Sequence, residues 1–493
     1  MSLTELETFD SLNPATGEVL ASYPRDGAAA VGDAVARAAT AAEWWGGLGF
    51  RERKRRLLDY KAVLTRNLAK VVAVVSEETG KPEGDAILET VLAITHLDWA
   101  ARHAASVLGR RRVPSGLVAM NMAATLEYLP LGVIGVIGPW NYPVFTPMGS
   151  IAYALAAGNA VVFKPSEYTP GVGVLLAELF TEAVPEQPVF QVVTGLGDTG
   201  AALAGNPGIK KIAFTGSAPT ARRVMAACAQ NLTPMVAECG GKDAFIVDAG
   251  ADLKAAADAA LWGAMSNSGQ TCVGVERVYA VTEVYDEFLR ELTERARGIR
   301  AGEHYGPITM PKQLDIIQRH IEDAAGSGKA VVGGPESVRA PFVDPVIVTD
   351  VPEDSGAVRE ETFGPTVTVK RVADVAEALE KANASAYGLA GTVFSGNTGR
   401  AVELARRMVT GMTAINSVIS FAGVPALPFG GVGESGFGRI HGADGLREFT
   451  RPKAVSRQRF AVPGMNLTSF GRTPAELDRL VKIVTLLHGR RKR

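Results

Sequence analysis

The spacing of hydrophobic and polar positions changes along this chain, and each change predicts a different kind of element. From about residue 28 to residue 108 the sequence is rich in Ala, Arg and Glu with few helix breakers, which predicts helices. From Val133 onward, short apolar runs alternate with longer stretches of helical spacing, which indicates a parallel sheet covered on both faces. The expected strands are 133–137, 160–163 and 189–193, and the helices between them are 143–157 and 171–183.

Polar residues follow these expected strands, at the carboxyl edge where parallel sheets bind ligands. Asn141, held between aromatic residues and prolines, could donate its amide to a developing oxyanion, although the same stretch also fits a structural turn. Lys164 and Glu167 could hydrogen-bond ribose hydroxyls, and the Glu167 carboxylate would repel a 2′-phosphate. Residues 195–200 match G-x-G-x-x-G only formally, and the segment 212–217 could meet a phosphate with its amides.

A second α/β pattern begins at Ala244, and the two strongest candidates for chemistry flank its start. Glu238 precedes a Gly-Gly-Lys turn, and Cys272 follows a small, polar stretch. A thiol that attacks a carbonyl and a desolvated carboxylate that acts as a general base would together give covalent catalysis. Taken alone, Cys272 also fits a small buried hydrophobe and Glu238 the end of a strand. We expect residues 238–241 to be a hinge between domains, which would place both candidates at an interdomain cleft.

Composition narrows the class of protein. A chain of 493 residues is expected to form two or three domains, and its net charge of −1 gives no reason to expect a nucleic-acid partner. Three cysteines (Cys228, Cys239 and Cys272) in unpaired spacing suggest free thiols in a reducing compartment, and no spacing is typical of a metal site. The N-terminus lacks the pattern of a signal peptide, and no apolar run is long enough for a membrane span, so a cytoplasmic location is expected.

The C-terminal tail has its own pattern. Residues 474–487 place apolar side chains at helical spacing, and the basic sequence Gly489–Arg493 follows them. We favour a helix that packs on the body or on a subunit partner, with contact to an anionic membrane surface as the less favoured alternative. The apolar positions are Leu477, Leu480, Val481, Val484 and Leu487.

Taken together, the motifs resemble those of the aldehyde dehydrogenase superfamily over roughly residues 13–455. No motif is decisive alone, but their combination in the family's order is highly specific. They are Pro139-Trp140-Asn141, Lys164-Pro165-Ser166-Glu167, Phe214-Thr215-Gly216-Ser217, Glu238 with Gly240-Gly241-Lys242, Gly269-Gln270 with Cys272, Glu361 with Phe363-Gly364-Pro365, and Asn416.

The resemblance implies an α/β fold of the aldehyde dehydrogenase type: a Rossmann-type parallel-sheet cofactor domain, an α/β catalytic domain and a small β oligomerisation arm. The arm would account for the isolated strand pattern at 123–129, and it implies a homodimer or homotetramer. The implied boundaries are 1–117, 133–240 and 433–449 for the NAD-binding domain, 241–432 for the catalytic domain, 118–132 and 450–462 for the arm, and 463–493 for a C-terminal helical extension.

The resemblance also implies an NAD(P)-dependent, non-acylating enzyme that oxidises an aldehyde to a carboxylic acid. Cys272 would attack the aldehyde, and the Asn141 side chain with the Cys272 amide would hold the oxyanion of the thiohemiacetal. Hydride transfer to the nicotinamide would leave a thioester, which water activated by Glu238 would hydrolyse. Glu167 favours NAD, with NADP as the alternative. The cofactor-binding residues carried over are Trp140, Lys164, Glu167, Gly197, Gly216, Ser217, Gly240, Glu361 and Phe363.

A largely apolar set of residues adjoins these motifs and favours a medium-chain or aromatic aldehyde as the substrate. The Gly-rich loop 428–439 and the Ile440-His441-Gly442 sequence are also more similar to the branch that acts on fatty and aromatic aldehydes. Succinate semialdehyde is the alternative, provided that an Arg receives its carboxylate. The expected substrate-pocket residues are Tyr142, Phe145, Thr271, Val273 and Phe421.

Two residues depart from the family pattern: Cys239 replaces a usual Leu, and Ala443 stands where many relatives carry an acidic residue. Three rival classes were weighed. A cysteine hydrolase would need a histidine base, and the sequence links no histidine to Cys272. A CoA-acylating dehydrogenase usually lacks a carboxylate at the position of Glu238. A catalytically inactive structural or binding protein of the same fold would be expected to lack one of these two residues.

Overall fold

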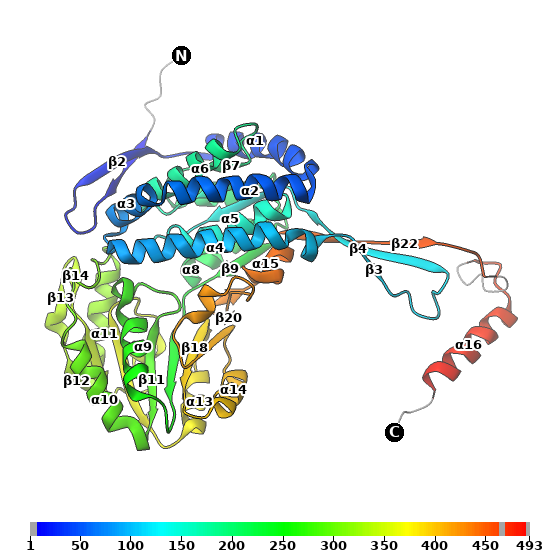
Figure 1. Ribbon diagram of the computed structural model, residues 1–493. Helices are drawn as coiled ribbons and strands as arrows, with labels where there is room; N and C mark the ends of the chain where they lie inside the picture. Colours follow the sequence, from blue (N-terminus) through cyan, green and yellow to red (C-terminus); the bar gives the residue numbers. More distant parts are fainter. Residues whose placement is uncertain (1–6, 463–468, 490–493) are drawn as a thin grey trace, which may run out of the picture. The chain divides into compact units, whose positions relative to one another are not determined.

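The computed structural model of the protein describes residues 7–462 and 469–489 (Figure 1). The N-terminal residues 1–6 and the basic residues 490–493 of the tail lie outside the described part. The chain divides into two compact units, one made of Met1–Val107 with Pro130–Thr450 and the other of Leu108–Leu129 with Arg451–Arg493.

The first unit begins with a hairpin and four helices. Strands β1 (Thr8–Leu12) and β2 (Val19–Pro24) pair antiparallel around the expected turn, where the Asn13 side chain accepts the Ala15 amide at 2.9 Å. The predicted helical region is confirmed and consists of α1 (Ala28–Gly47), α2 (Gly49–Arg66), α3 (Leu68–Thr79) and α4 (Glu83–Leu108).

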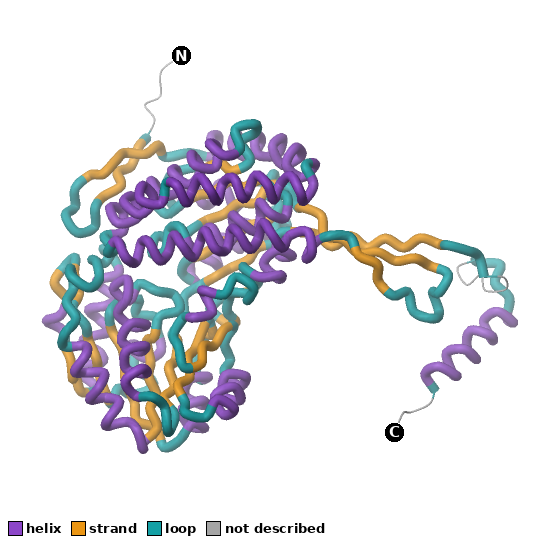
Figure 2. The backbone as a smooth tube through the Cα atoms, viewed as in Figure 1, coloured by secondary structure: helices purple, strands orange, loops and turns teal. Residues whose placement is uncertain are grey.

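A six-stranded sheet with the order β21-β9-β8-β5-β6-β7 confirms the parallel sheet predicted after Val133. Neighbouring strands pair in parallel except β21, which is antiparallel to β9. Figure 2 shows helices beside this sheet, and its central strands are buried throughout. The strands are β5 (Val133–Ile137), β6 (Ala160–Lys164), β7 (Phe190–Val192), β8 (Lys211–Thr215), β9 (Met235–Glu238) and β21 (Gly436–Phe437). The helices that follow them are α5 (Phe145–Ala157), α6 (Pro170–Ala183), α7 (Gly197–Ala204) and α8 (Ala218–Ala229).

The expected helix 143–157 begins two residues later than the sequence pattern indicates. The Glu89 carboxylate of α4 accepts the backbone N–H groups of Val144 and Phe145 at 2.7 and 3.2 Å, and so caps α5 from another helix. A cap supplied by a distant residue cannot be read from local spacing.

The second sheet of this unit has seven strands in the order β12-β15-β16-β11-β10-β18-β19, parallel except for β12. Its core includes Phe245, Tyr279 and Phe288, each at most 2% exposed. The strands are β10 (Asp243–Val247), β11 (Val275–Val281), β12 (Lys329–Val332), β15 (Val346–Thr349), β16 (Thr366–Val372), β18 (Ala390–Phe394) and β19 (Met412–Ile415). The helices are α9 (Leu253–Met265), α10 (Thr282–Ala296), α11 (Gln313–Ser327), α12 (Gly356–Arg359), α13 (Val375–Asn383) and α14 (Thr398–Arg407). Helix α15 (Gly442–Glu448) instead packs on α5 beside the six-stranded sheet.

Short elements complete the first unit: strands β13 (Val338–Arg339), β14 (Phe342–Val343), β17 (Tyr387–Gly388) and β20 (Val432–Gly433), and 3₁₀ turns η1 (Ser266–Gly269), η2 (Pro335–Ser337) and η3 (Ser420–Gly423). The chain passes from β9 to β10, and so from one sheet to the other, through residues 239–242. The expected hinge is therefore the connection between the two sheets.

The second unit contains a three-stranded sheet in the order β22-β4-β3, made of β3 (Arg111–Val113), β4 (Met122–Pro130) and β22 (Thr450–Gln458). The strand expected at 123–129 is thus confirmed. Helix α16 (Pro474–His488) confirms the helix predicted in the tail, and none of its side chains is buried. The surface on which α16 packs stays a prediction, as does the role of the sheet in oligomerisation. No helix in the described part of the chain is long and apolar enough to cross a membrane.

Candidate active site

The carboxyl edge of the six-stranded sheet gathers the polar residues that the sequence pattern places after its strands. Lys164, Thr215 and Glu238 are the last residues of β6, β8 and β9. Asn141 follows β5 by four residues. Because parallel strands end at one edge, these side chains from distant parts of the chain lie along the same rim.

Cys272 follows a left-handed turn that buried hydrogen bonds hold in place. Asn267, Ser268 and Gly269 have φ values of 51°, 60° and 70°, a conformation that costs energy for residues with a Cβ atom. A Cβ atom on Gly269 would lie 2.0 Å from the Gly364 carbonyl oxygen, so only glycine fits there. The Ser268 hydroxyl donates to the Gly306 carbonyl at 2.5 Å, and Gln270 Oε1 accepts the Thr309 amide at 2.8 Å. The surrounding chain therefore fixes the position of Cys272.

Asn141 joins this turn to the edge of the sheet. Its Nδ2 donates to the Gln270 carbonyl at 2.9 Å, which uses one of its two N–H groups. The backbone carbonyl of Asn141 accepts hydrogen bonds from Asn267 Nδ2 at 3.1 Å and from Lys81 Nζ at 2.7 Å. Among the described residues no further hydrogen bond uses Asn141 Nδ2, so its second N–H group is available as a donor.

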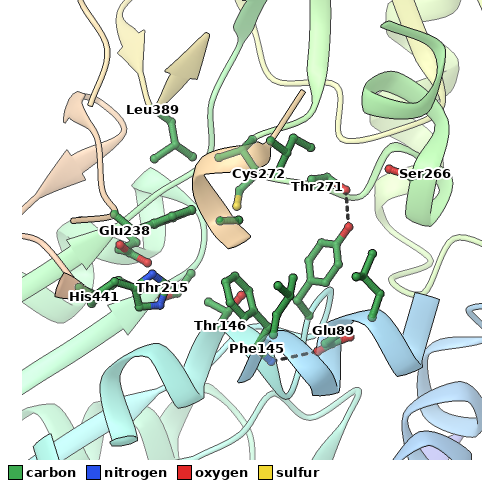
Figure 3. Close-up of a pocket in the computed structure, with 18 of the residues that line it drawn as sticks. Glu89, Phe145, Thr146, Thr215, Glu238, Ser266, Thr271, Cys272, Leu389 and His441 are labelled. Carbon is green, nitrogen blue, oxygen red and sulfur yellow. Dashed lines mark hydrogen bonds between the residues drawn. The ribbon is translucent and has the colours of Figure 1, made fainter. Parts of the chain in front are cut away.

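Cys272 and Glu238 line one cavity, whose volume is about 890 Å³ when the open solvent at its mouth is included (Figure 3). Its wall is mostly apolar and includes Leu88, Leu92, Trp262, Leu389, Ile419 and Phe429. Four of the five expected pocket residues line it: Tyr142, Phe145, Thr271 and Val273. Phe421 does not. Its ring lies behind the wall, 6.2 Å from the ring of Phe429, while the neighbouring Ile419 and Ala422 face the cavity.

The electrostatics of this cavity favour neutral groups. Burial raises the pKa of Glu238 to about 8, and no described residue hydrogen-bonds its buried Oε1. Burial, and then the nearby carboxylates of Glu238 and Glu361, raise the pKa of the Cys272 thiol. The Val273 N–H bonded to the sulfur acts in the opposite direction. Both groups are therefore protonated near neutral pH when no ligand is bound, so a carboxyl with an unsatisfied oxygen stands ready to exchange a proton in the cavity that holds the thiol.

A second hollow of about 600 Å³ adjoins the first, and Glu238 and Cys272 lie where they meet. The residues that line both hollows are Thr146, Thr215, Glu238, Cys239 and Cys272. Six of the nine expected cofactor-binding residues line the second hollow: Trp140, Gly216, Ser217, Gly240, Glu361 and Phe363. Lys164, Glu167 and Gly197 do not. Lys164 Nζ lies 3.5 Å from Glu167 at the end of β6, and Gly197 begins α7.

The second hollow fits the chemistry of a dinucleotide. The Trp140 and Phe363 rings, 5.6 Å apart and nearly perpendicular, form an aromatic wall. Residues Gly216 and Ser217 lead into α8, whose N-terminus favours an anion such as a pyrophosphate. Glu361 accepts the Gly241 amide at 3.1 Å, and a Cβ atom on Gly240 would lie 1.9 Å from its carboxylate. Only glycine at position 240 keeps that carboxylate in the hollow.

Two buried ion pairs support the site and were missed by sequence reasoning. Lys81 and Glu89 pair at 2.7 Å with fully buried side chains, and Lys81 Nζ also lies 4.3 Å from the Tyr142 ring. Lys242 pairs with Glu276, whose carboxylate accepts the Thr362 amide and so positions the residues next to Glu361. Glu89 had a local signal, because it shares helical spacing with the buried Ala86, Ala93 and Leu97 of α4.

The described part of the chain contains further hydrogen bonds around Cys272. Tyr142 Oη and Thr271 Oγ1 are 2.9 Å apart, and burial raises the pKa of Tyr142.

His441 also lines the first cavity, with its ring 3.9 Å from that of His96. Burial and the neighbouring His96 hold the pKa of His441 well below its usual value, so it carries no charge near neutral pH. Cys239 is buried beside Glu361, and burial raises its pKa to about 11.

Comparison with known proteins places this site in one family. A model of the aldehyde dehydrogenase family matches residues 2–455. The 4,4′-diapolycopene aldehyde oxidase of a Methylomonas species is 37% identical over 93% of this chain and 87% of that protein. A probable succinate-semialdehyde dehydrogenase [NADP(+)] of Sinorhizobium fredii is 35% identical over 90% of this chain and 91% of that protein. A betaine aldehyde dehydrogenase point mutant from Staphylococcus aureus, solved in complex with NAD⁺, superposes with a TM-score of 0.87 at 28% identity, covering 92% of this chain and 95% of that one. The resemblance and the fold class inferred from the sequence are thereby confirmed: the chain belongs to the aldehyde dehydrogenase family and is an oxidoreductase that acts on aldehydes.

Proposed function

We propose that this protein oxidises an apolar aldehyde to the carboxylic acid with NAD, through a thiohemiacetal and then a thioester on Cys272. The observation that carries the proposal is the meeting of two hollows at Cys272 and Glu238. One hollow is apolar and the other suits a dinucleotide. An aldehyde in the first hollow would place its carbonyl carbon beside the thiol at the junction. The same carbon would then face a dinucleotide in the second hollow.

In this mechanism Glu238 first releases its own proton to solvent, and its carboxylate then accepts the thiol proton of Cys272. The sulfur bonds to the carbonyl carbon as the carbonyl π electrons move to the oxygen. The second N–H of Asn141 and the Cys272 amide donate to the oxyanion that forms. NAD, when bound, supplies the acceptor for the hydride that leaves this carbon. Glu238 releases its proton to solvent and, ionised again, takes a proton from water. The water oxygen bonds to the thioester carbon, and the carbon–sulfur bond breaks to release the acid and the Cys272 thiolate. The raised pKa of Glu238 makes it a stronger base than an exposed carboxylate.

The substrate follows from the charges of the first cavity. Among the described residues that line it, none is Lys or Arg, whereas Asp85 and Glu89 add carboxylates and His441 is neutral. A medium-chain or aromatic aldehyde suits this wall. The relative named for 4,4′-diapolycopene aldehyde supports an apolar substrate. Succinate semialdehyde is the second candidate because a relative carries that name, but its carboxylate would enter this cavity without a cation to receive it.

Glu167 supports NAD rather than NADP as the cofactor. Its carboxylate is 40% exposed at the end of β6 and would repel a 2′-phosphate bound at the nearby Lys164. The NAD⁺ complex of the betaine aldehyde dehydrogenase agrees with this choice, and the [NADP(+)] name of the Sinorhizobium fredii relative marks the alternative. We further propose a homodimer or homotetramer assembled through the three-stranded sheet of the second unit.

The test is NADH formation with octanal, benzaldehyde, propanal and succinate semialdehyde, using wild-type protein and Cys272→Ala. Cys228→Ala is the matched control, since Cys228 is buried in α8 and lines neither hollow. We expect turnover of the apolar aldehydes, none with Cys272→Ala, and normal turnover with Cys228→Ala. Turnover that survives in Cys272→Ala would refute the proposed nucleophile, and a preference for succinate semialdehyde would refute the proposed substrate.

A further inference from the structure

The C-terminal segment 456–493 differs in charge from the rest of the chain and lies beyond the match to the family, which ends at residue 455. It carries nine Lys and Arg against two Asp and Glu, whereas the other 455 residues carry 42 against 50. A basic end on an acidic protein directs that end toward an anionic partner. The match to the family model stops just before this segment, so the match does not account for its charge.

Helix α16 gives this segment an exposed apolar face. A capping box between Thr473 and Glu476 fixes its start. By helical spacing Asp478, Lys482 and the exposed Leu486 occupy the opposite side, and Thr485 lies at the margin of the apolar face. None of its side chains is buried, and Val481 is 60% exposed. The apolar face consists of Leu477, Leu480, Val481, Val484 and Leu487.

The same unit also carries a hollow lined by arginines. Its described lining contains Arg110, Arg111, Arg112, Arg457 and Arg459, and no acidic residue is among the described residues that line it. None of the ion pairs formed within the described residues uses any of these five side chains. The second unit therefore offers both exposed apolar side chains and positive charge that described carboxylates leave unneutralised.

A lipid surface matches this combination. At 15 residues α16 is about 22 Å long, shorter than the roughly 30 Å hydrocarbon core of a bilayer, so it suits lying on a membrane rather than crossing it. Apolar side chains on one face with basic residues around them are the features by which helices bind anionic lipid surfaces. We propose that helix α16 docks the enzyme on the surface of an anionic bilayer, with its apolar face in the headgroup region. An apolar aldehyde concentrates in such a bilayer, so docking would bring the enzyme to its substrate if the proposed function holds. Binding to the bilayer itself does not depend on the proposed function.

The experiment is sedimentation of the full-length protein with vesicles of phosphatidylcholine, either pure or mixed with phosphatidylglycerol. We expect binding to the anionic vesicles, binding at least about tenfold weaker to the neutral ones, and weakening by salt. Ending the chain at His488 removes the basic residues 490–493, and we expect it to reduce binding about tenfold or more.

Two neighbouring substitutions separate the apolar face from charge alone. Val484→Asp and Thr485→Asp add the same charge to adjacent positions, but only Val484 lies on the apolar face. We expect Val484→Asp to abolish vesicle binding and Thr485→Asp to retain most of it, with octanal turnover in vesicle-free buffer unchanged in both. Equal effects of the two substitutions, or equal binding to neutral and anionic vesicles, would overturn the proposal. So would dissociation of an oligomer by Val484→Asp without loss of vesicle binding, which would assign the face to a second copy of the chain. Because turnover without vesicles is measured separately, failure of the docking is distinguishable from failure of the proposed function.

Discussion

Replacing Glu238 by Gln removes a carboxyl that the folded protein can ionise only at high cost. Burial raises the pKa of Glu238 from its usual 4.5 to about 8, because the low-polarity cavity disfavours the carboxylate. Below pH 4.5 this carboxyl is neutral in both the folded and the unfolded state, and the free energy of unfolding is at its full value. As the pH rises from 4.5 toward 8, the carboxyl ionises in the unfolded state but stays neutral in the folded one, so the free energy of unfolding falls. Glu238→Gln stays neutral throughout and escapes this loss.

The magnitude follows from the same pKa values. Each pH unit between the unfolded and folded pKa is worth about 1.4 kcal/mol. The free energy of unfolding of Glu238→Gln should therefore gain on that of the wild type by roughly 4 kcal/mol between about pH 5 and about pH 8.5. Glu361 and the buried histidines titrate in both proteins, so the difference between the proteins isolates Glu238.

The assay is urea unfolding of ligand-free protein, followed by tryptophan fluorescence at several pH values. Glu43→Gln, at an exposed position of α1, is the control for the loss of one carboxyl that does not line the cavity. An infrared titration of the protonated carboxyl band, taken as wild type minus Glu238→Gln, reads the pKa directly without unfolding. A midpoint near 4.5, or a stability difference that stays flat from pH 5 to pH 8.5, would refute the reasoning.

Three further predictions concern the oxyanion, the cofactor and the substrate. Asn141→Ala should lower kcat about 100-fold or more, roughly 3 kcal/mol of transition-state stabilisation, and an unchanged kcat with octanal would contradict its role. Gly240→Ala should weaken NAD binding measured by fluorescence quenching, because its Cβ atom would collide with Glu361, whereas Gly197→Ala meets nothing within 4 Å and should bind NAD normally. The kcat/KM for succinate semialdehyde should lie at least about 100-fold below that for octanal, since an unpaired buried charge costs several kcal/mol, and comparable values would exclude the apolar assignment.

The parts of the fold that follow from local spacing were predictable from the sequence. Strands β5, β6 and β7 and the helices between them were expected within a few residues of where they lie, because apolar period and breakers are local signals. The carboxyl-edge rule then placed Asn141, Lys164 and Glu238 on one rim. The parallel sheet and the family followed from the same residues.

The contacts that position the site were not predictable, because they join residues far apart in the chain. Glu276 holds the Thr362 amide 86 residues away, and Lys81 holds the Asn141 carbonyl 60 residues away. Phe421 was expected in the pocket from its closeness to motifs, but the turn at η3 presents its neighbours to the cavity instead. Spacing along the chain does not say which of adjacent residues in a turn faces a cavity.

The most direct test of the account is intact-mass spectrometry of Glu238→Gln after one turnover with octanal and NAD. We predict that hydride transfer occurs once and that hydrolysis stalls, so an octanoyl group stays bound to the protein and peptide mapping locates it on Cys272. An unmodified protein after a full equivalent of NADH has formed, or an acyl group on Cys239, would contradict the central claim that Cys272 carries the thioester and Glu238 activates the water that releases it.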